Sequence, residues 1–229
     1  MAKRTVVVCI ALALMCCITS AAWAAMNKLT PAEKAAGWKL LFDGKTLTGW
    51  KATGNPEGWA VENGVIANLA KNGGLLATDG RFGNFTFYCE FKNEENANSG
   101  IFFRWADLAD PVQRGIEMQI FDSYGNKNPG RHDCGAIYDV LAPRVQACKP
   151  AGQWNKVSLT CRDNLVWIDL NGKRVIYMNL NQWTTPHMNP DGTGNKFSTA
   201  YKDMPRAGHI GFQDHGHKVW FRNVKIRPL

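Results

Sequence analysis

Residues 85–92 read Phe-Thr-Phe-Tyr-Cys-Glu-Phe-Lys, and apolar and polar side chains alternate along the whole stretch. In an extended chain, a period of two places Phe85, Phe87, Cys89 and Phe91 on one face and the four other residues on the opposite face. Antiparallel sheets with one covered face show this pattern. The stretch therefore predicts a β-strand with one buried face.

The same alternation recurs on both sides of this strand. Val166-Trp-Ile-Asp-Leu is followed by Asn171-Gly172 and then by Lys-Arg-Val-Ile-Tyr, which predicts a hairpin because Asn-Gly supplies the two positive-φ positions of a type I′ turn. Residues 156–161 alternate in the same way. Further strands are expected at 39–42, 59–61, 65–68, 75–78, 101–105, 116–121, 209–212 and 219–226.

Helical signals are scarce. One short helix is expected after Thr30, a capping residue followed by Pro31 and closed by Gly37. Many short strands without βαβ alternation predict an all-β fold of two packed antiparallel sheets. Two long polar loops, 122–149 and 179–206, are expected to carry function or to be mobile.

The N-terminus has the layout of a secretory signal peptide. Lys3 and Arg4 precede an apolar run over 6–18, and Ala22-Trp-Ala24 has the small-x-small pattern of a cleavage site. The run is too short for a membrane-spanning helix, although an uncleaved anchor is the alternative. We therefore expect residues 1–24 to be removed, residues 25–229 to form one β-sandwich domain without a transmembrane segment, and the mature protein to be periplasmic or secreted.

The charge excludes one class of partner. The formal net charge is +8, and losing Lys3 and Arg4 with the signal peptide leaves 8 − 2 = +6. Basic residues in the tail 218–227 alternate with apolar ones, as on the wet face of a strand and unlike a basic arm. We expect no nucleic-acid partner.

Four cysteines remain after the signal peptide, which suits an oxidising compartment. Cys134 and Cys148 flank a loop-rich stretch and are the expected disulfide, whereas Cys89 and Cys161 are either buried thiols or a second bridge. There is no Cys-x-x-Cys pair, so a zinc or redox motif is not expected.

Glu117 and Gln119 are the most informative polar pair. They lie on one face of the expected strand 116–121, while Ile116, Met118 and Ile120 lie on the other. If this face of the sheet is concave, Glu117 lies in a pocket and can act as a base, and burial there can shift its pKa. The alternative is an ordinary solvated sheet face. Other candidate side chains concentrate near strand ends. They are Arg104 and Trp105, Asp122, and the polar stretch with Gln213, Asp214, His215 and His217.

Histidines and tryptophans supply weaker candidates. Two of the histidines His132, His215 and His217, together with Glu117 and Asp122, have the chemistry of divalent-metal ligands. Their spacing matches no compact motif, so no metal ligands are assigned. For each histidine, the alternative to acting as a base or a metal ligand is a purely structural role. Trp105 and Trp183 adjoin polar loops and are candidates for stacking on a sugar ring, with burial in the core as the alternative.

Several longer motifs resemble the 3-keto-disaccharide hydrolase family. They follow one another in order over nearly the whole mature chain, although 179–206 matches no motif residue by residue. The motifs are Leu41-Phe-Asp-Gly-Lys-Thr-Leu-Thr-Gly-Trp50, Gly58-Trp-Ala-Val-Glu-Asn-Gly-Val-Ile66, Asn98-Ser-Gly-Ile-Phe-Phe-Arg104, Ile116-Glu-Met-Gln-Ile-Phe-Asp122, Cys134-Gly-Ala-Ile-Tyr138, Gly152-Gln-Trp-Asn155, Leu170-Asn-Gly-Lys173, Gly208-His-Ile-Gly-Phe-Gln-Asp-His-Gly216 and Val219-Trp-Phe-Arg-Asn-Val224.

The resemblance implies a concanavalin-like or laminarinase-like jelly-roll sandwich, export, and cleavage of glycosides oxidised at C3. A C3 ketone acidifies the C2 proton, so one base can remove it and expel the aglycone from C1, after which water adds. This chemistry requires a base, a stabiliser of the enolate oxygen and an acid for the leaving group.

On that basis Glu117 is expected to be the base, and the substrate a small carbohydrate. A divalent cation at the enolate oxygen is an alternative to a protein cation; no cofactor is assigned. The remaining roles are Arg104 or His132 for the enolate, His215 or Tyr138 for the leaving group, Gln119, Asp122 and Gln213 for sugar hydroxyls, and Trp105 for stacking.

Three other functions remain open. An ordinary glycosidase needs two carboxylates, but the position beside Glu117 holds Gln119. A non-catalytic carbohydrate-binding module is the second, since this fold often only binds. A structural role at the cell surface is the third.

Overall fold

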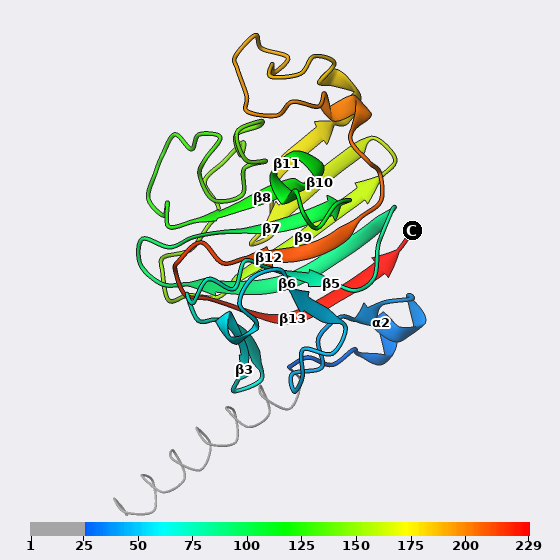
Figure 1. The fold of residues 1–229 in the computed structure, drawn as a ribbon, viewed down its shortest axis with the longest axis vertical. Helices are drawn as coiled ribbons and strands as arrows, with labels where there is room; N and C mark the ends of the chain where they lie inside the picture. The colour runs from blue at the N-terminus through cyan, green and yellow to red at the C-terminus, as the bar shows by residue number, and fades with distance from the viewer. Residues whose placement is uncertain (1–25) are drawn as a thin grey trace, which may run out of the picture.

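The computed structural model describes residues 26–229, so the expected signal peptide at 1–24 lies outside the described residues. Two antiparallel sheets pack face to face (Figure 1). The larger sheet has the order β11-β10-β9-β6-β13-β4-β3, with β1 also paired to β13. Its strands are β1 (Lys39–Leu40), β3 (Trp59–Glu62), β4 (Val65–Asn68), β6 (Phe85–Asn93), β9 (Asn155–Arg162), β10 (Leu165–Leu170), β11 (Lys173–Asn179) and β13 (Val219–Pro228).

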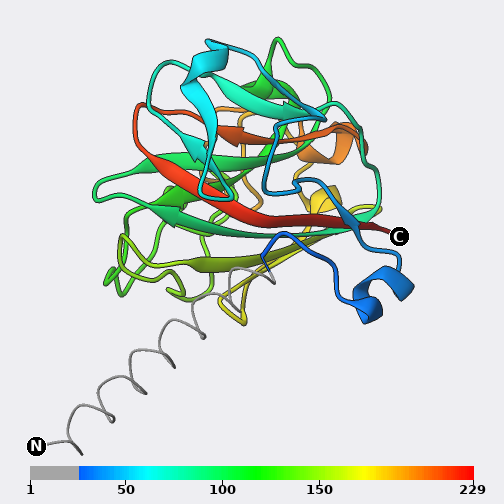
Figure 2. The same cartoon turned by 90° about the horizontal axis from the view of Figure 1, so that it is seen from below.

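The smaller sheet has the order β2-β5-β12-β7-β8. In both sheets every pairing is antiparallel, and Figure 2 shows the two layers from below. The expected all-β sandwich is thus confirmed. The strands of this sheet are β2 (Trp50–Ala52), β5 (Leu75–Thr78), β7 (Asn98–Trp105), β8 (Ile116–Phe121) and β12 (His209–Gln213).

The core lies between the sheets and follows the period-two pattern. Phe87 and Phe221 of the larger sheet meet Phe212 of the smaller one, where the rings of Phe212 and Phe221 stack with centroids 3.8 Å apart. All three side chains are at most 1% exposed. Since alternate residues face inward, their neighbours in sequence are left on the two outer faces of the sandwich.

The structure also confirms the predicted hairpin turn and the predicted helix cap. Asn171 and Gly172 have φ values of 52° and 80°, as the hairpin between β10 and β11 requires. Thr30 and Glu33 form a capping box at α2 (Pro31–Ala35). The sequence analysis missed β2, whose three residues are too few to show a period. The other short helices are α3 (Pro111–Arg114), η1 (Pro56–Gly58), η2 (Leu180–Gln182) and η3 (Tyr201–Asp203).

The two long loops, 122–149 and 179–206, contain little regular structure but pack against the sandwich. Residues 180–206 form the extension drawn in orange at the top of Figure 1, where Trp183, Phe197 and Tyr201 are buried. None of the helices in the described part of the chain is long and apolar enough to cross a membrane.

Candidate functional site

Strands β7 and β8 position the central carboxylate. Their register places Glu117 opposite Phe102 and Gln119 opposite Gly100, on the outer face of the smaller sheet. A Cβ at position 100 would overlap the Glu117 carboxylate. Glycine at this position therefore lets the Glu117 side chain lie flat across β7.

Strand β12 adds polar groups to the same face. Phe212 pairs with Ile101, and Gln213 follows it with its side chain on the outer side. A pocket of about 160 Å³ opens here, and we call it the Glu117 pocket. It is lined by Asn98, Val112, Glu117, Gln119, Tyr138, Lys196, Gln213 and His215.

Residues 135–138 form turns along the free edge of β8, where Ile137 makes an isolated antiparallel bridge to Met118. The amide of Gly135 donates to the carbonyl of Gln119 at 2.8 Å, and the amide of Tyr138 donates to the carbonyl of Glu117 at 3.0 Å. Edge pairing of this kind fixes the register of the loop. It is the reason why Tyr138 stands beside Glu117 even though 20 residues separate them.

Lys196 reaches the pocket from the 179–206 loop. Its backbone amide donates to Asp139 Oδ2 at 2.8 Å, and its carbonyl accepts from Gln113 Nε2 at 3.2 Å. Its ammonium group lies 4.1 Å from the ring centroid of Tyr138. The loop thus supplies a cation to a pocket whose only carboxylate, among the described lining residues, is Glu117.

Burial dominates the electrostatics of Glu117. The side chain is 9% exposed, and desolvation raises the pKa of Glu117 to about 7, opposed only by the positive charge of Lys196. Desolvation, followed by the charge of Glu117, also raises the pKa of Tyr138, which keeps its hydroxyl protonated. The pocket therefore pairs a base that titrates near neutrality with a proton donor.

Two amide oxygens in the pocket have no hydrogen-bond partner, Oε1 of Gln119 and Oε1 of Gln213. Gln119 is 2% exposed, and its Nε2 donates to Asn98 Oδ1 at 3.0 Å, which fixes the orientation of the amide. Buried acceptors are nearly always paired in native proteins. These two oxygens thus mark places for the hydroxyl donors of a ligand.

The structure corrects the prediction for Arg104, which does not reach the pocket. Arg104 has a left-handed φ of 49° at a bulge of β7, so the strand alternation breaks there. Its side chain is fully buried and donates to the carbonyls of Gly83 and Asp163 and to Asn84 Oδ1. Arg104 therefore holds strand ends together.

Two predicted sugar-stacking tryptophans are also corrected. Trp105 is 0% exposed beside Phe102, and its indole donates to the carbonyl of Asp107. Trp183 is 6% exposed and donates to Asn189 Oδ1. Both indoles are enclosed by protein, so neither ring offers a free face to a ligand.

Of the remaining predicted residues, some line the Glu117 pocket and others lie outside it. Gln119, Tyr138, Gln213 and His215 line the Glu117 pocket, as stated above. His132 lies just outside, paired with Asp139 at 3.0 Å and with its ring 4.8 Å from that of Tyr138.

Asp122 follows β8 and accepts from the backbone amide of Asn96, outside the lining. Among residues 26–229 no three His, Cys, Asp or Glu side chains cluster as metal ligands.

Cys134 and Cys148 are neighbours, although the structure shows both as free thiols. A hydrogen bond from Cys134, followed by those of Gln146 and Ser123, lowers the pKa of Cys148 to about 7 against the opposing effect of burial. Cys89 and Cys161 are separate, fully buried thiols. The structure thus does not show the expected disulfide, but the Cys134 and Cys148 side chains are neighbours joined by a hydrogen bond.

Sequence reasoning missed Asn98 and Lys196 as pocket residues. Asn98 had a signal, since it lies two residues before Gly100 on the same strand face. Lys196 had none, because its loop could be matched to no motif and only tertiary contacts bring it beside Tyr138.

Comparisons with known proteins agree with this fold. Residues 37–227 match the family described as 3-keto-alpha-glucoside-1,2-lyase-like domain. A 3-keto-disaccharide hydrolase of Bacteroides thetaiotaomicron is 28% identical, over 90% of this chain and 83% of its own length.

Two crystal structures from Parabacteroides distasonis, both provisionally described as glycosyl hydrolases, are similar over the whole sandwich. One is 34% identical with a TM-score of 0.76 and covers 84% of this chain and 99% of its own. The other is 28% identical with a TM-score of 0.72, and it covers 89% of this chain and 99% of its own. From the match over 37–227 and these relatives it follows that the chain belongs to the 3-keto-alpha-glucoside-1,2-lyase-like family, as its motifs indicated.

Proposed function

We propose that this chain cleaves 3-keto-glycosides by elimination and rehydration, with Glu117 as the base. The observation that carries the proposal is a single desolvated carboxylate, with a pKa of about 7, in a pocket of otherwise uncharged or cationic groups. A base of this pKa removes protons efficiently near neutral pH. The name of the Bacteroides relative supports the same substrate class.

The reaction balances with this residue set. Glu117 takes the C2 proton, and the C2–H electron pair forms the enolate of the C3 ketone. The enolate re-forms the ketone as the C1–O bond breaks, leaving a C1=C2 double bond while the aglycone oxygen takes a proton. Water then adds its oxygen to C1 and gives one proton back to the group that protonated the aglycone, while C2 regains a proton from the Glu117 carboxylic acid.

Lys196 takes the role that the sequence suggested for Arg104. Its ammonium group is the cation that acts electrostatically on Glu117, so it is suited to stabilise negative charge on the C3 oxygen. Tyr138 and His215 remain the two candidate acids for the leaving group. Gln119 and Gln213 accept hydrogen bonds from sugar hydroxyls through their unpaired oxygens.

Direct glycoside hydrolysis fits the pocket less well. Retaining and inverting glycosidases place two carboxyl groups on either side of the scissile bond. Among the described residues that line this pocket, Glu117 is the sole carboxylate. A non-catalytic sugar-binding module would not require a glutamate held at a pKa of about 7.

The first test compares a 3-keto-glucoside with the unoxidised glucoside, with chelator and with added divalent metal. We expect release of the aglycone from the keto form alone. Release from both substrates would indicate an ordinary glycosidase, and release from neither under all metal conditions would indicate a binding module. Dependence on added metal would assign part of the enolate stabilisation to a cation.

A second test addresses the mechanism. In D₂O, elimination followed by addition of water places deuterium at C2 of the product, whereas displacement at C1 leaves the C2 hydrogen in place. Early time points and an enzyme-free control separate catalysed exchange from the background exchange of the ketone. Since Glu117 can return the same proton before it exchanges with solvent, the rate on substrate deuterated at C2 is measured in parallel. Product without deuterium at C2 in D₂O, together with no isotope effect on that substrate, would rule out the proposed proton abstraction.

We further propose that the chain is exported and that Cys134 and Cys148 form a disulfide after export. A thiolate beside a second thiol is ready for oxidation once an oxidant is present. Intact mass of the exported protein, alkylated without reduction, should show two fewer alkyl groups than the reduced sample and a chain that begins after Ala24. Four alkylated cysteines without reduction would contradict the bridge.

A further inference from the structure

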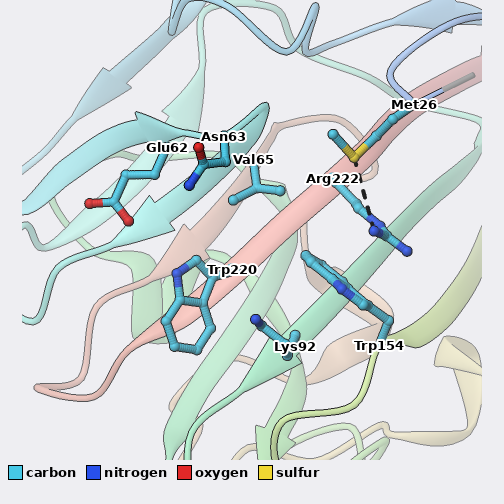
Figure 3. A pocket seen from close by; sticks show the side chains of 8 residues that line it. All are labelled: Met26, Glu62, Asn63, Val65, Lys92, Trp154, Trp220 and Arg222. Carbon is cyan, nitrogen blue, oxygen red and sulfur yellow. Dashed lines mark hydrogen bonds between the residues drawn. The ribbon is translucent and has the colours of Figure 1, made fainter. Parts of the chain in front are cut away.

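A larger pocket, of about 280 Å³, lies on the outer face of the larger sheet, remote from Glu117 (Figure 3). Trp154 and Trp220 stand on either side of Lys92 in it, and Arg222, Glu62 and Asn63 lie around them. We call it the tryptophan groove. Most of its side chains come from β3, β4, β6, β13 and the segment before β9, so the β-sandwich forms the platform, while Met26 closes one side and accepts from Arg222.

The platform is rigid. Trp220 lies on β13, where it pairs with Lys92 of β6 on one side and with Ala67 of β4 on the other. Trp154 is held by its own carbonyl, which accepts from Lys149 Nζ at 3.0 Å, and by the fully buried Asn155 that follows it. Rings fixed before binding lose little conformational entropy when a ligand arrives.

The charges of the groove are largely balanced within the protein. Arg222 donates to Glu90 at 2.8 Å, and its guanidinium carbon lies 4.0 Å from the ring centroid of Trp154. The ammonium group of Lys92 lies 4.5 Å from the centroid of Trp220. Glu62 adds a second carboxylate. The lining holds two cations and one carboxylate, and the buried Glu90 that pairs with Arg222 balances the remaining charge, which disfavours phosphate, nucleic acid or an anionic glycan as the ligand.

Arg222 covers part of the Trp154 ring and Lys92 part of the Trp220 ring, but both tryptophans remain partly exposed. Their exposed parts adjoin hydrogen-bonding groups of both kinds. The C–H face of a sugar ring carries partial positive charge and is attracted to the negative face of an indole. Lys92 donates, Glu62 accepts and Asn63 does both, which matches hydroxyl groups that donate and accept. A ligand rich in hydroxyl groups and without charge uses all of these features.

We propose that the tryptophan groove is a second, non-catalytic binding site for a neutral saccharide chain. It lies on the opposite side of the sandwich from the Glu117 pocket, so it holds the protein to a glycan without touching the reacting atoms. The inference does not depend on the proposed reaction, because it concerns binding of a saccharide that need not be oxidised.

The test measures binding of maltotetraose, cellotetraose and laminaritetraose by the whole mature chain, by calorimetry and tryptophan fluorescence. We expect at least one to bind, with affinity at least tenfold weaker in Trp154→Ala and in Trp220→Ala. Trp167→Ala is the matched control, since Trp167 lies on β10 outside the groove and its loss should change affinity less than twofold. Turnover of a small soluble 3-keto-glucoside should stay within twofold in all three.

Other outcomes would overturn the proposal. These are no binding of any tetrasaccharide at millimolar concentration, binding only of a uronate-containing chain, or binding that survives both substitutions and is lost in Gln119→Leu, which would place the saccharide in the Glu117 pocket. If Trp220→Ala fails to fold, Trp154→Ala carries the test alone, and an affinity equal to that of the parent protein would count against the groove. Unchanged binding by Glu117→Gln separates this result from failure of the reaction.

Discussion

Glu117 and Glu90 are both buried glutamates, on the outer faces of the two sheets, yet their surroundings differ. Glu90 accepts from Arg222 at 2.8 Å, from Tyr88 at 3.0 Å and from Asn223 at 3.1 Å. Burial alone would raise the pKa of Glu90, but Arg222 in particular outweighs it and holds the pKa below its ordinary value.

At Glu117 only the charge of Lys196 opposes burial, so the pKa rises to about 7. A satisfied carboxylate stabilises a binding surface, whereas an unsatisfied one is available for proton transfer, at a cost to folding. The difference therefore supports the two proposals, chemistry in the Glu117 pocket and binding in the tryptophan groove.

The largest expected effect comes from removing the base. Glu117→Gln should lower kcat on a 3-keto-glucoside by about 10³-fold or more, because an amide cannot take the C2 proton. Steady-state kinetics measure the loss, and Glu57→Gln, at an exposed position of η1, is the control that should keep full activity. Activity retained in Glu117→Gln would require another base.

The same variant should be more stable than the parent protein at high pH. The pKa of Glu117 rises from 4.5 to about 7 on folding, so the carboxyl binds its proton more tightly in the folded state. The protonated Glu117 carboxyl makes its whole contribution to stability below pH 4.5. This contribution falls as the pH rises to 7 and is absent at higher pH.

The rise corresponds to about 3 kcal/mol. At pH 8 Glu117→Gln should therefore raise the free energy of unfolding by up to this amount, and at pH 4 much less. Urea unfolding at the two pH values measures the difference, and a gain that does not depend on pH would contradict the raised pKa.

Gly100→Ala should displace the carboxylate without changing its chemistry. A methyl group at position 100 overlaps the end of the Glu117 side chain, which is flexible enough to move aside. Because small misplacements of a reacting group are costly, we expect kcat/KM to fall by about 10²-fold with little change in Tm. In the control Gly83→Ala, the new Cβ would meet nothing closer than 3.8 Å, so its activity should be unchanged.

The smallest effect is expected at Lys196. Lys196→Met should lower kcat by about tenfold, through loss of charge stabilisation on the enolate. Because Lys196 lowers the pKa of Glu117, its removal should raise that pKa further, so that activity appears at higher pH than in the parent protein. Lys202→Met in the same loop is the control, and a pH–rate profile identical to that of the parent protein would remove Lys196 from the site.

Much of the fold is already visible in the chain. Period-two alternation located the strands, Asn171-Gly172 located a hairpin, and Thr30 with Pro31 located a helix, because each depends on the preferences of neighbouring residues. The same alternation placed Glu117 and Gln119 on one face. Local patterns of this kind are read directly from sequence since the physics that produces them is local.

Contacts between distant residues were not predictable in this way. The bulge at Arg104 turned a predicted site residue into a buried anchor, which alternation along one strand does not reveal. Lys196 reaches Tyr138 only after its loop docks on Asp139 and Gln113.

The sequence by itself determined a β-sandwich with a carboxylate and an amide side by side on β8. Only the tertiary structure decided that Glu117 is desolvated and lacks an arginine while Glu90 has one, because burial and pairing arise from packing between strands far apart in the chain.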